Sequence, residues 1–415
     1  MVADRIADQA LQYIDEHQEE LVQLLQQLVR AKSVHGNEER VAGIIWPELE
    51  ALGFEVKNFP VEPSRPNLVA TFRGSVGSPK MLGYAHMDTV GPGDEAAWSV
   101  DPFGGEVKDG KIWGRGTCDH KGSIAAFLIA FRALRAAGFA PKGNLVYVFD
   151  SDEEKGGHQG MRHLVKINAF SADFGLYGCT TQISQESKAN FPMFGPSNII
   201  GAAMGAQVFK ITVSGTRPPR RNLMYPPGRP TALDNALGLL QVLNEYAEKV
   251  RKRVCPLTGP SRMHFQGVEY TPSPLVGLPD EISFKVYRRI NLLEDLDEER
   301  EAIFNLIKEF QSQNRQVEIE AEILEERPQT RVSEEMPVIP ALKRAGLAVD
   351  GIEPRYTGAP SLTGLGWFVN EKKIPIVMFG YGHLDFHHSI DEHIAVEDLV
   401  KSTKVYALTI RKLIG

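Results

Sequence analysis

The chain has 415 residues, of which 42% are hydrophobic and 24% charged, a composition typical of a globular protein. This length exceeds one typical hydrophobic core and predicts two domains. The formal net charge of −7 argues against a nucleic-acid-binding protein. Three cysteines are too few for a disulfide framework and indicate a reducing, cytoplasmic location. The charged N-terminal residues and the lack of a long apolar run predict neither a signal peptide nor a membrane span.

Strand and helix patterns alternate through the first half of the chain. Leu21, Leu24, Leu25 and Leu28 recur with helical spacing, and residues 123–139 form a long apolar helical pattern. Short apolar strands are predicted at residues 67–72, 80–85, 144–150 and 173–178, and another at 374–382 before a final helix at 397–414. Continuous apolar strands between helices predict an α/β fold with a largely parallel sheet and helices on both faces.

The middle of the chain has a different order of elements. Strand patterns at 207–215, 263–271, 281–290 and 317–326 are interrupted by helical patterns at 231–250 and 297–310. This β-α-β-β-α-β order is typical of a small two-layer domain. We therefore expect residues 206–326 to form an inserted lid domain, and residues 1–205 and 327–415 to form the two parts of a catalytic α/β domain.

Ionisable side chains follow the ends of the predicted strands, or precede a helix in a glycine-rich turn. In chain order they are His86, Asp88, Asp119, Glu153, Glu154, His387 and His388. One such residue is more often structural than functional. In open α/β sheets, however, ligands bind beyond the carboxyl ends of the strands, where these side chains are expected to meet. Imidazole and carboxylate ligands together suit Zn²⁺, Mn²⁺ or Co²⁺.

Four motifs in this order carry a resemblance to a known family: "AHMDTV", "WGRGTCDHKG", "DSDEEKGG" and "HSIDE". They resemble the metallopeptidase family of aminoacylase, carboxypeptidase G and succinyl-diaminopimelate desuccinylase, over nearly the whole chain. The resemblance implies that His86 binds one metal ion, that Asp119 bridges two, and that Glu154 and His388 complete the second set of ligands. It also implies that Glu153 is the general base and acid. Asp88 would orient His86.

The sequence departs from this family at three places: at Cys179, at Pro219 and in the loop "TGAPSLTG", which lacks the family's usual Asp. Cys179 stands where the family usually has a carboxylate ligand for the metal held by His86, and Pro219 replaces a lid histidine that stabilises an oxyanion. The Cys179 thiolate could bind Zn²⁺ at about 2.3 Å. Alternatively the thiol is a small buried apolar group and this metal position is empty. We favour the second reading and expect one Zn, Mn or Co ion per chain.

Arginines of the lid are candidates for binding a substrate carboxylate, since guanidinium and carboxylate groups form paired hydrogen bonds. One loop carries four of them: Arg217, Arg220, Arg221 and Arg229. Arg288 and Arg289, at the end of a predicted strand, resemble the carboxylate-binding arginine of the family. Of all these, we expect Arg221, Arg288 and Arg289 to bind substrate.

The expected function is that of a metal-dependent hydrolase that cleaves a C–N bond of a small acidic substrate. By default this bond is the amide of an N-acyl amino acid or dipeptide. One alternative is a hydrolytic deaminase of an aminoaromatic acid, similar to nitroanthranilate aminohydrolase, and another is a non-catalytic binding protein. The resemblance implies a homodimer through the lid domain, with neither nucleic acid nor membrane as a partner.

Overall fold

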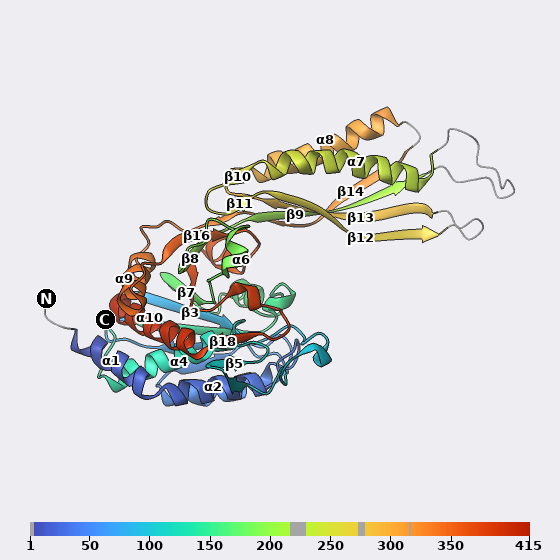
Figure 1. Ribbon diagram of the computed structural model, residues 1–415. Coiled ribbons are helices and arrows are strands. Elements are labelled where there is room, and N and C mark those ends of the chain that lie inside the picture. The colour runs from blue at the N-terminus through green and yellow to red at the C-terminus, as the bar shows by residue number, and fades with distance from the viewer. Residues whose placement is uncertain (1–3, 216–229, 273–278, 315–316) are drawn as a thin grey trace. The chain divides into compact units, whose positions relative to one another are not determined.

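The computed structural model describes residues 4–215, 230–272, 279–314 and 317–415. These divide into two compact units, coloured along the chain in Figure 1. The first comprises Met1–Gly201, Arg331–Thr357 and Trp367–Gly415, and the second comprises Ala202–Thr330 and Gly358–Gly366. The segment Gly358–Gly366, which the predicted boundaries assign to the catalytic domain, belongs to the second unit.

A nine-stranded sheet forms the centre of the first unit, in the order β1-β2-β6-β3-β7-β17-β8-β15, with β16 paired to β8. Its four central strands are parallel, which confirms the predicted α/β class. Strands β1, β2 and β8 add antiparallel pairs at the two sides. The strand bounds are β1 Glu55–Asn58, β2 Leu68–Phe72, β3 Lys80–His86, β6 Asn144–Asp150, β7 Phe174–Gly178, β8 Asn198–Ala203, β15 Thr330–Arg331, β16 Arg355–Ala359 and β17 Ile376–Phe379.

Helix α4 is the central helix of this unit and is apolar around nearly its whole circumference. It packs against β3 and β7, and α1, α2 and α10 cover it in turn, so it lies in the interior. On the opposite face of the sheet, Tyr84 and Tyr177 contact Phe368 of a short π-helix, Trp367–Glu371. The helix bounds are α1 Arg5–Glu16, α2 Gln18–Arg30, α3 Glu39–Ala51, α4 Lys121–Ala136, α5 Met161–Lys166, α6 Gln185–Lys188, α9 Val338–Asp350 and α10 Val396–Ile414.

A glycine at the end of β7 allows α4 to approach the sheet closely. A Cβ atom added to Gly178 would lie 2.6 Å from Cβ of Ser123 and 2.7 Å from the ring of Phe127. Only glycine therefore fits there without displacing the first turns of α4. This contact brings Cys179, the next residue, close to the glycine-rich loop that precedes α4.

A small three-stranded sheet joins that loop to the C-terminal part of the chain. It consists of β18 His393–Ala395, β5 Lys111–Trp113 and β4 Glu106–Lys108, all antiparallel. The pairing holds the "HSIDEH" motif beside residues 111–113, far away in sequence. The sequence patterns do not predict this sheet, because its strands have only three residues each.

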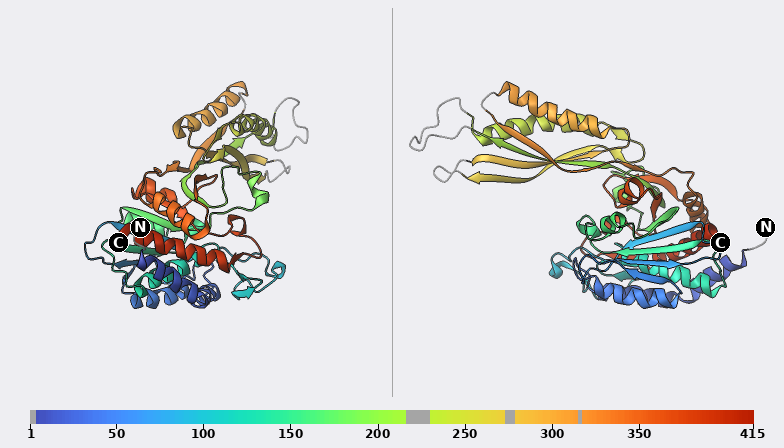
Figure 2. Two further views of the ribbon diagram at one scale, coloured as in Figure 1. Left: turned by 60° about the vertical axis from the view of Figure 1, so that its left-hand side comes forward. Right: turned by 180° about the vertical axis from the view of Figure 1, so that it is seen from behind.

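The second unit has two layers, with α7 and α8 on one face of a four-stranded antiparallel sheet (Figure 2). Its β-α-β-β-α-β order confirms the predicted lid fold. Thr231 and Asp234 form a capping box at the start of α7, and the core lies between helices and sheet. The bounds are β9 Gly205–Ser214, α7 Ala232–Arg251, β12 Arg262–Pro272, β13 Pro279–Ile290, α8 Leu296–Gln313 and β14 Ile319–Arg327, with a small hairpin of β10 Val254–Cys255 and β11 Gly259–Pro260.

Within the described parts of the chain, we find no helix with the length and apolar character needed to cross a membrane. Cys118, Cys179 and Cys255 are buried and free of disulfides.

Candidate metal and catalytic site

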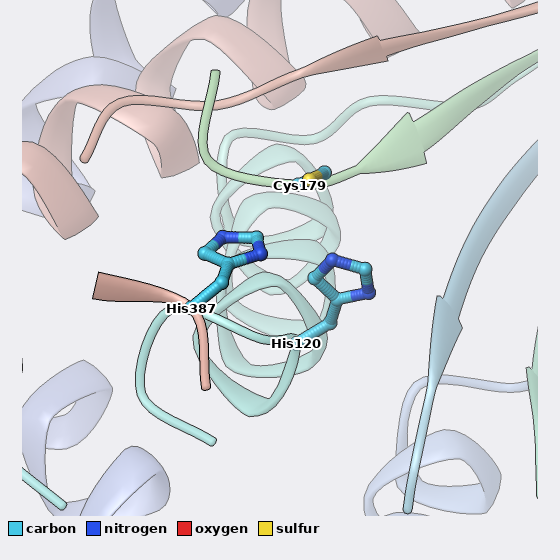
Figure 3. A group of neighbouring side chains, drawn as sticks. All are labelled: His120, Cys179 and His387. Atoms are coloured by element: carbon cyan, nitrogen blue, oxygen red, sulfur yellow. The ribbon is translucent and has the colours of Figure 1, made fainter. Parts of the chain in front are cut away.

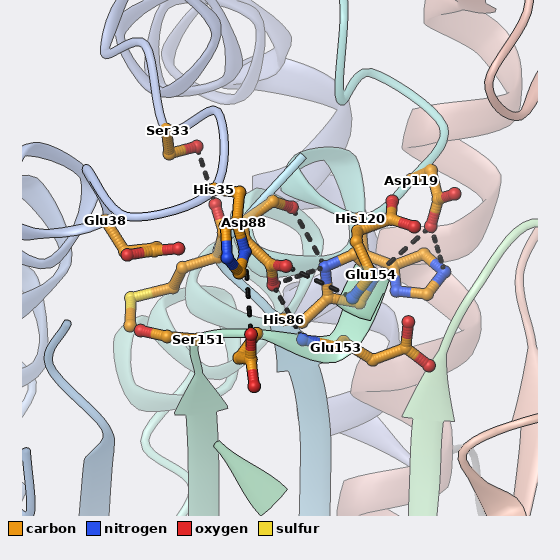
Figure 4. A network of polar contacts seen from close by, with 12 residues as sticks. Ser33, His35, Glu38, His86, Asp88, Asp119, His120, Ser151, Glu153 and Glu154 are labelled. Atoms are coloured by element: carbon orange, nitrogen blue, oxygen red, sulfur yellow. Dashed lines mark hydrogen bonds and ion pairs between the residues drawn. The ribbon is translucent and has the colours of Figure 1, made fainter. Parts of the chain in front are cut away.

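The predicted site residues of the first unit gather where the parallel strands end. His86 is the last residue of β3, Glu153 and Glu154 follow β6, and Cys179 follows β7. Because β6, β3, β7 and β17 run in the same direction, their carboxyl ends share one edge of the sheet. The structure thus brings together side chains from segments that are far apart in sequence, as Figure 4 illustrates for ten labelled residues.

His86 is buried between two carboxylates. Its Nδ1 lies 3.3 Å from Oδ1 of Asp88 and 3.0 Å from that residue's carbonyl oxygen, and its Nε2 lies 3.2 Å from Oδ1 of Asp119. Burial by itself would raise the pKa of Asp88, but His86 and the backbone N–H groups of Glu153 and Glu154 hold it below its usual value. Asp88 therefore stays ionised, fixes the ring of His86 and ties it to the Glu153–Glu154 turn.

Asp119 is the residue on which the cluster converges. Its Oδ1 lies 2.9 Å from Nε2 of His120, and its Oδ2 lies 3.2 Å from Nδ1 of His387 and 3.0 Å from Nε2 of His388. With His86, four imidazoles surround one carboxylate that is only 6% exposed. Burial opposes ionisation, yet the charges of His387 and His120 lower the pKa of Asp119 well below its usual value.

A buried glutamate that the sequence motifs do not single out fixes the Asp119 loop. Oε1 of Glu392 accepts hydrogen bonds from the backbone N–H groups of Gly116, Cys118 and Asp119, at 3.1, 2.9 and 3.2 Å. Its Oε2 lies 2.7 Å from Nη1 of Arg115. Glu392 lies within the quoted "HSIDE" motif, but nothing in the pattern indicates that it binds backbone groups 273 to 276 positions away.

The first candidate metal site consists of Asp119, Glu154 and His388. Their ligand atoms all lie within 4.8 Å of one another. Nε2 of His388 lies 2.9 Å from Oε2 of Glu154, and the His388 side chain is 52% exposed, so the group is open on one side. His388 has a positive φ of 59°, a strained conformation that aims its ring at the two carboxylates. Two oxygen donors and one imidazole suit Zn²⁺, Mn²⁺ or Co²⁺.

Glu153, the predicted proton carrier, lies next to this group without joining it. The Tyr177 hydroxyl donates a hydrogen bond to its Oε1 at 3.3 Å. Burial, reinforced by the charges of Glu154 and Asp119, raises the pKa of Glu153 to about 7. A carboxyl group with a pKa near 7 can both accept and return a proton at neutral pH. Tyr177 lies in the predicted strand 173–178, but the sequence offers no sign of this role.

A second group combines His120, Cys179 and His387, whose ligand atoms also lie within 4.8 Å of one another (Figure 3). His86, Asp119 and His120 form an adjoining group by the same criterion. The family resemblance assigns no ligand role to His120 or His387. The available signal was position alone, since His120 directly follows Asp119 and His387 directly precedes His388.

The lid arginines that were candidates for substrate binding differ in where they lie. Arg217, Arg220, Arg221 and Arg229, like Pro219, lie outside the described residues. Arg288 is fully buried, with Nη2 2.8 Å from Oε2 of Glu299 and a further ion pair to Glu294. Its expected role in substrate binding is therefore corrected to a structural one.

Arg289 points to the other face of β13, because successive side chains of a strand alternate. Its guanidinium lies over the Tyr287 ring at 4.7 Å, and its Nη1 is buried without a hydrogen-bond partner among the described residues. Ile282, Phe284 and Val286 alternate as core residues along β13. Continuing this alternation in the sequence places Arg288 inward and Arg289 on the other face.

Comparison with known proteins shows the family and the fold of the chain. The model of the family described as Peptidase family M20/M25/M40 matches residues 82–412. A succinyl-diaminopimelate desuccinylase of Maricaulis maris is 27% identical over 391 residues, covering 92% of this chain and 93% of the relative. An N-formyl-4-amino-5-aminomethyl-2-methylpyrimidine deformylase of Halalkalibacterium halodurans is 24% identical, covering 96% and 95%. The crystal structure of human carnosine dipeptidase 1 matches with a TM-score of 0.74 at 19% identity, covering 98% of each chain.

Proposed function

Because the chain belongs to peptidase family M20/M25/M40, we propose that it hydrolyses the amide bond of a small acidic N-acyl amino acid or dipeptide. It is a metal-dependent hydrolase that acts on C–N bonds. The alternative of a non-catalytic binding protein is therefore wrong. The deaminase alternative is not favoured, since the names of the two curated relatives describe the removal of a succinyl and a formyl group.

The arrangement that carries this proposal is Glu153 beside the Asp119, Glu154 and His388 group. A divalent metal ion at that group would polarise the scissile carbonyl and lower the pKa of a water molecule. Glu153 takes the proton from water and returns it to the leaving nitrogen, and the Tyr177 hydroxyl at 3.3 Å holds its Oε1 in place. Asp88 keeps His86 oriented toward Asp119. One such catalytic ion per chain is part of the proposal.

An acidic substrate is proposed on the basis of Arg289. This side chain keeps a buried Nη1 group without a hydrogen-bond partner in the described chain, and burial lowers the pKa of its guanidinium. A carboxylate would satisfy the unpaired donor and the charge together. Arg221 remains a second candidate.

The proposal also covers the oligomeric state and the cellular location of the enzyme. We propose a homodimer through the second unit, as the sequence resemblance implies. The three free cysteines support a location in the reducing cytoplasm.

A substrate panel tests the proposal. The metal-loaded protein would be assayed by release of the free amine from N-succinyl, N-formyl and dipeptide substrates, each compared with an uncharged analogue of the same length. We expect turnover of acidic members, and loss of that turnover in Glu153→Gln prepared identically. Cleavage of neutral analogues alone would refute the acidic substrate, and absence of cleavage throughout the panel would refute the proposed substrate class.

A further inference from the structure

Three side chains that the catalytic arrangement does not use come together near the end of β7. His120, Cys179 and His387 come from the loop before α4, the residue after β7 and the segment after β17 (Figure 3). Their ligand atoms all lie within 4.8 Å of one another. A tetrahedral Zn²⁺ ion with bonds of about 2.0–2.3 Å needs nitrogen and sulfur donors about 3.3–3.6 Å apart. The separations between donors would therefore need to shorten by at most about 1.2–1.5 Å.

The buried His120 ring makes no hydrogen bond within the described parts of the chain, although it lies close to Asp119. It is 3% exposed, and neither ring nitrogen has a hydrogen-bond partner among the described residues. Its Nε2 approaches Oδ1 of Asp119 to 2.9 Å without the geometry of a hydrogen bond. Buried polar atoms are nearly always paired, so an unpaired imidazole aimed into a cluster of donors indicates a missing ligand.

His387 is held for ligation by a neighbouring hydroxyl. Its Nε2 lies 2.6 Å from Oγ1 of Thr180. When Nε2 donates its proton to this oxygen, Nδ1 presents a lone pair toward Oδ2 of Asp119, 3.2 Å away. Metal-bound histidines typically use the second ring nitrogen in this way, for a hydrogen bond that fixes the tautomer.

We propose that His120, Cys179 and His387 bind a second metal ion through nitrogen and sulfur, with Asp119 as a further donor. Soft thiolate with imidazole selects Zn²⁺ over Mn²⁺, whereas the Asp119, Glu154 and His388 group offers mainly oxygen. The two positions therefore differ in metal preference. This reverses the sequence-based preference for an apolar Cys179 and an empty position. The inference depends on the proposed function only in that both sites share Asp119.

Cobalt spectroscopy tests this site without any need for turnover. Metal-free full-length protein would be titrated with Co²⁺ while the near-ultraviolet thiolate-to-cobalt charge-transfer band is recorded. We expect the band in the natural protein, its displacement by Zn²⁺ but not by Mn²⁺, and its absence in Cys179→Ser. The matched control is Cys255→Ser, another buried thiol, which should keep the band.

Zinc content gives a second, independent measurement. Cys179→Ser should weaken binding of the second zinc ion at least about 100-fold, since loss of a hydrogen-bond partner behind a ligand alone costs about 10–100-fold. Absence of the band in the natural protein at saturating Co²⁺, or its persistence in Cys179→Ser, would overturn the inference. Amide hydrolysis without the band would leave the proposed function standing, and the band without hydrolysis would leave this site standing.

Discussion

Oε1 of Glu392 accepts a hydrogen bond from the backbone N–H of Asp119 at 3.2 Å, so a buried carboxylate outside both metal groups holds a ligand of the first group that also lies close to two histidines of the second. The same oxygen binds two more backbone N–H groups, and Arg115 neutralises the charge. The position of Asp119 is thus set by a residue 273 positions away.

Replacement of Glu392 by Gln should destabilise the fold and weaken metal binding together. The variant leaves Arg115 buried without its charge partner, a change that typically costs about 3–5 kcal/mol. Urea unfolding of the metal-free protein measures this loss. The control is Glu397→Gln, an exposed glutamate paired with Lys401, which should cost about 0.5 kcal/mol or less. Equal effects of the two variants would show that Glu392 has no special role.

Glu153 and Glu154 are adjacent, and the same substitution should separate their roles. Glu153→Gln should keep the metal and lower kcat by about 10²–10⁴-fold, because the amide cannot carry the proton. Glu154→Gln should instead lose metal, since it removes a charged ligand. Metal analysis of dialysed protein together with kcat distinguishes the two. Near-natural kcat in Glu153→Gln would exclude it as proton carrier.

Metal removal should lower the thermal stability of the natural protein reversibly. An ion that binds only the folded state contributes about 2.7 kcal/mol at 100 times its Kd. Differential scanning calorimetry with chelator and with restored Zn²⁺ measures the change in Tm. Asp119→Asn should abolish this metal-dependent change, because the first group loses a carboxylate ligand and the second loses the further donor proposed for it. A variant that still gains stability from Zn²⁺ would show that Asp119 is dispensable for binding.

Arg288 and Arg289 are neighbours on β13 with opposite expected effects. Arg288→Ala should cost about 1.5–3 kcal/mol, because Glu299 loses one charged hydrogen bond but keeps Arg253 and Tyr246, and this cost should not depend on substrate charge. Arg289→Ala should leave the free energy of unfolding nearly unchanged and raise KM about 10–100-fold for acidic substrates only, the cost of one charged hydrogen bond. Equal KM changes for neutral analogues would count against carboxylate binding by Arg289.

The sequence alone determined the α/β class, the order of elements in the second unit and the strand ends at which His86, Glu153 and Glu154 lie. These features follow from apolar periodicity and turn residues, which act over a few neighbouring positions. Because the central strands are parallel, their carboxyl ends, and the residues that follow them, lie at one edge of the sheet. The alternation of core residues along β13 was an available signal for the inward direction of Arg288, but both Arg288 and Arg289 were expected to bind substrate.

Only the tertiary structure decided which side chains meet at that edge. Cys179 by itself reads as a buried thiol, and its relation to His120 and His387 depends on the close approach of α4 at Gly178 and on the path of the chain after β17. The three backbone groups held by Glu392 depend likewise on the small sheet that pairs β18 with β5. Local propensity does not encode distances between segments remote in sequence; packing and strand register set them.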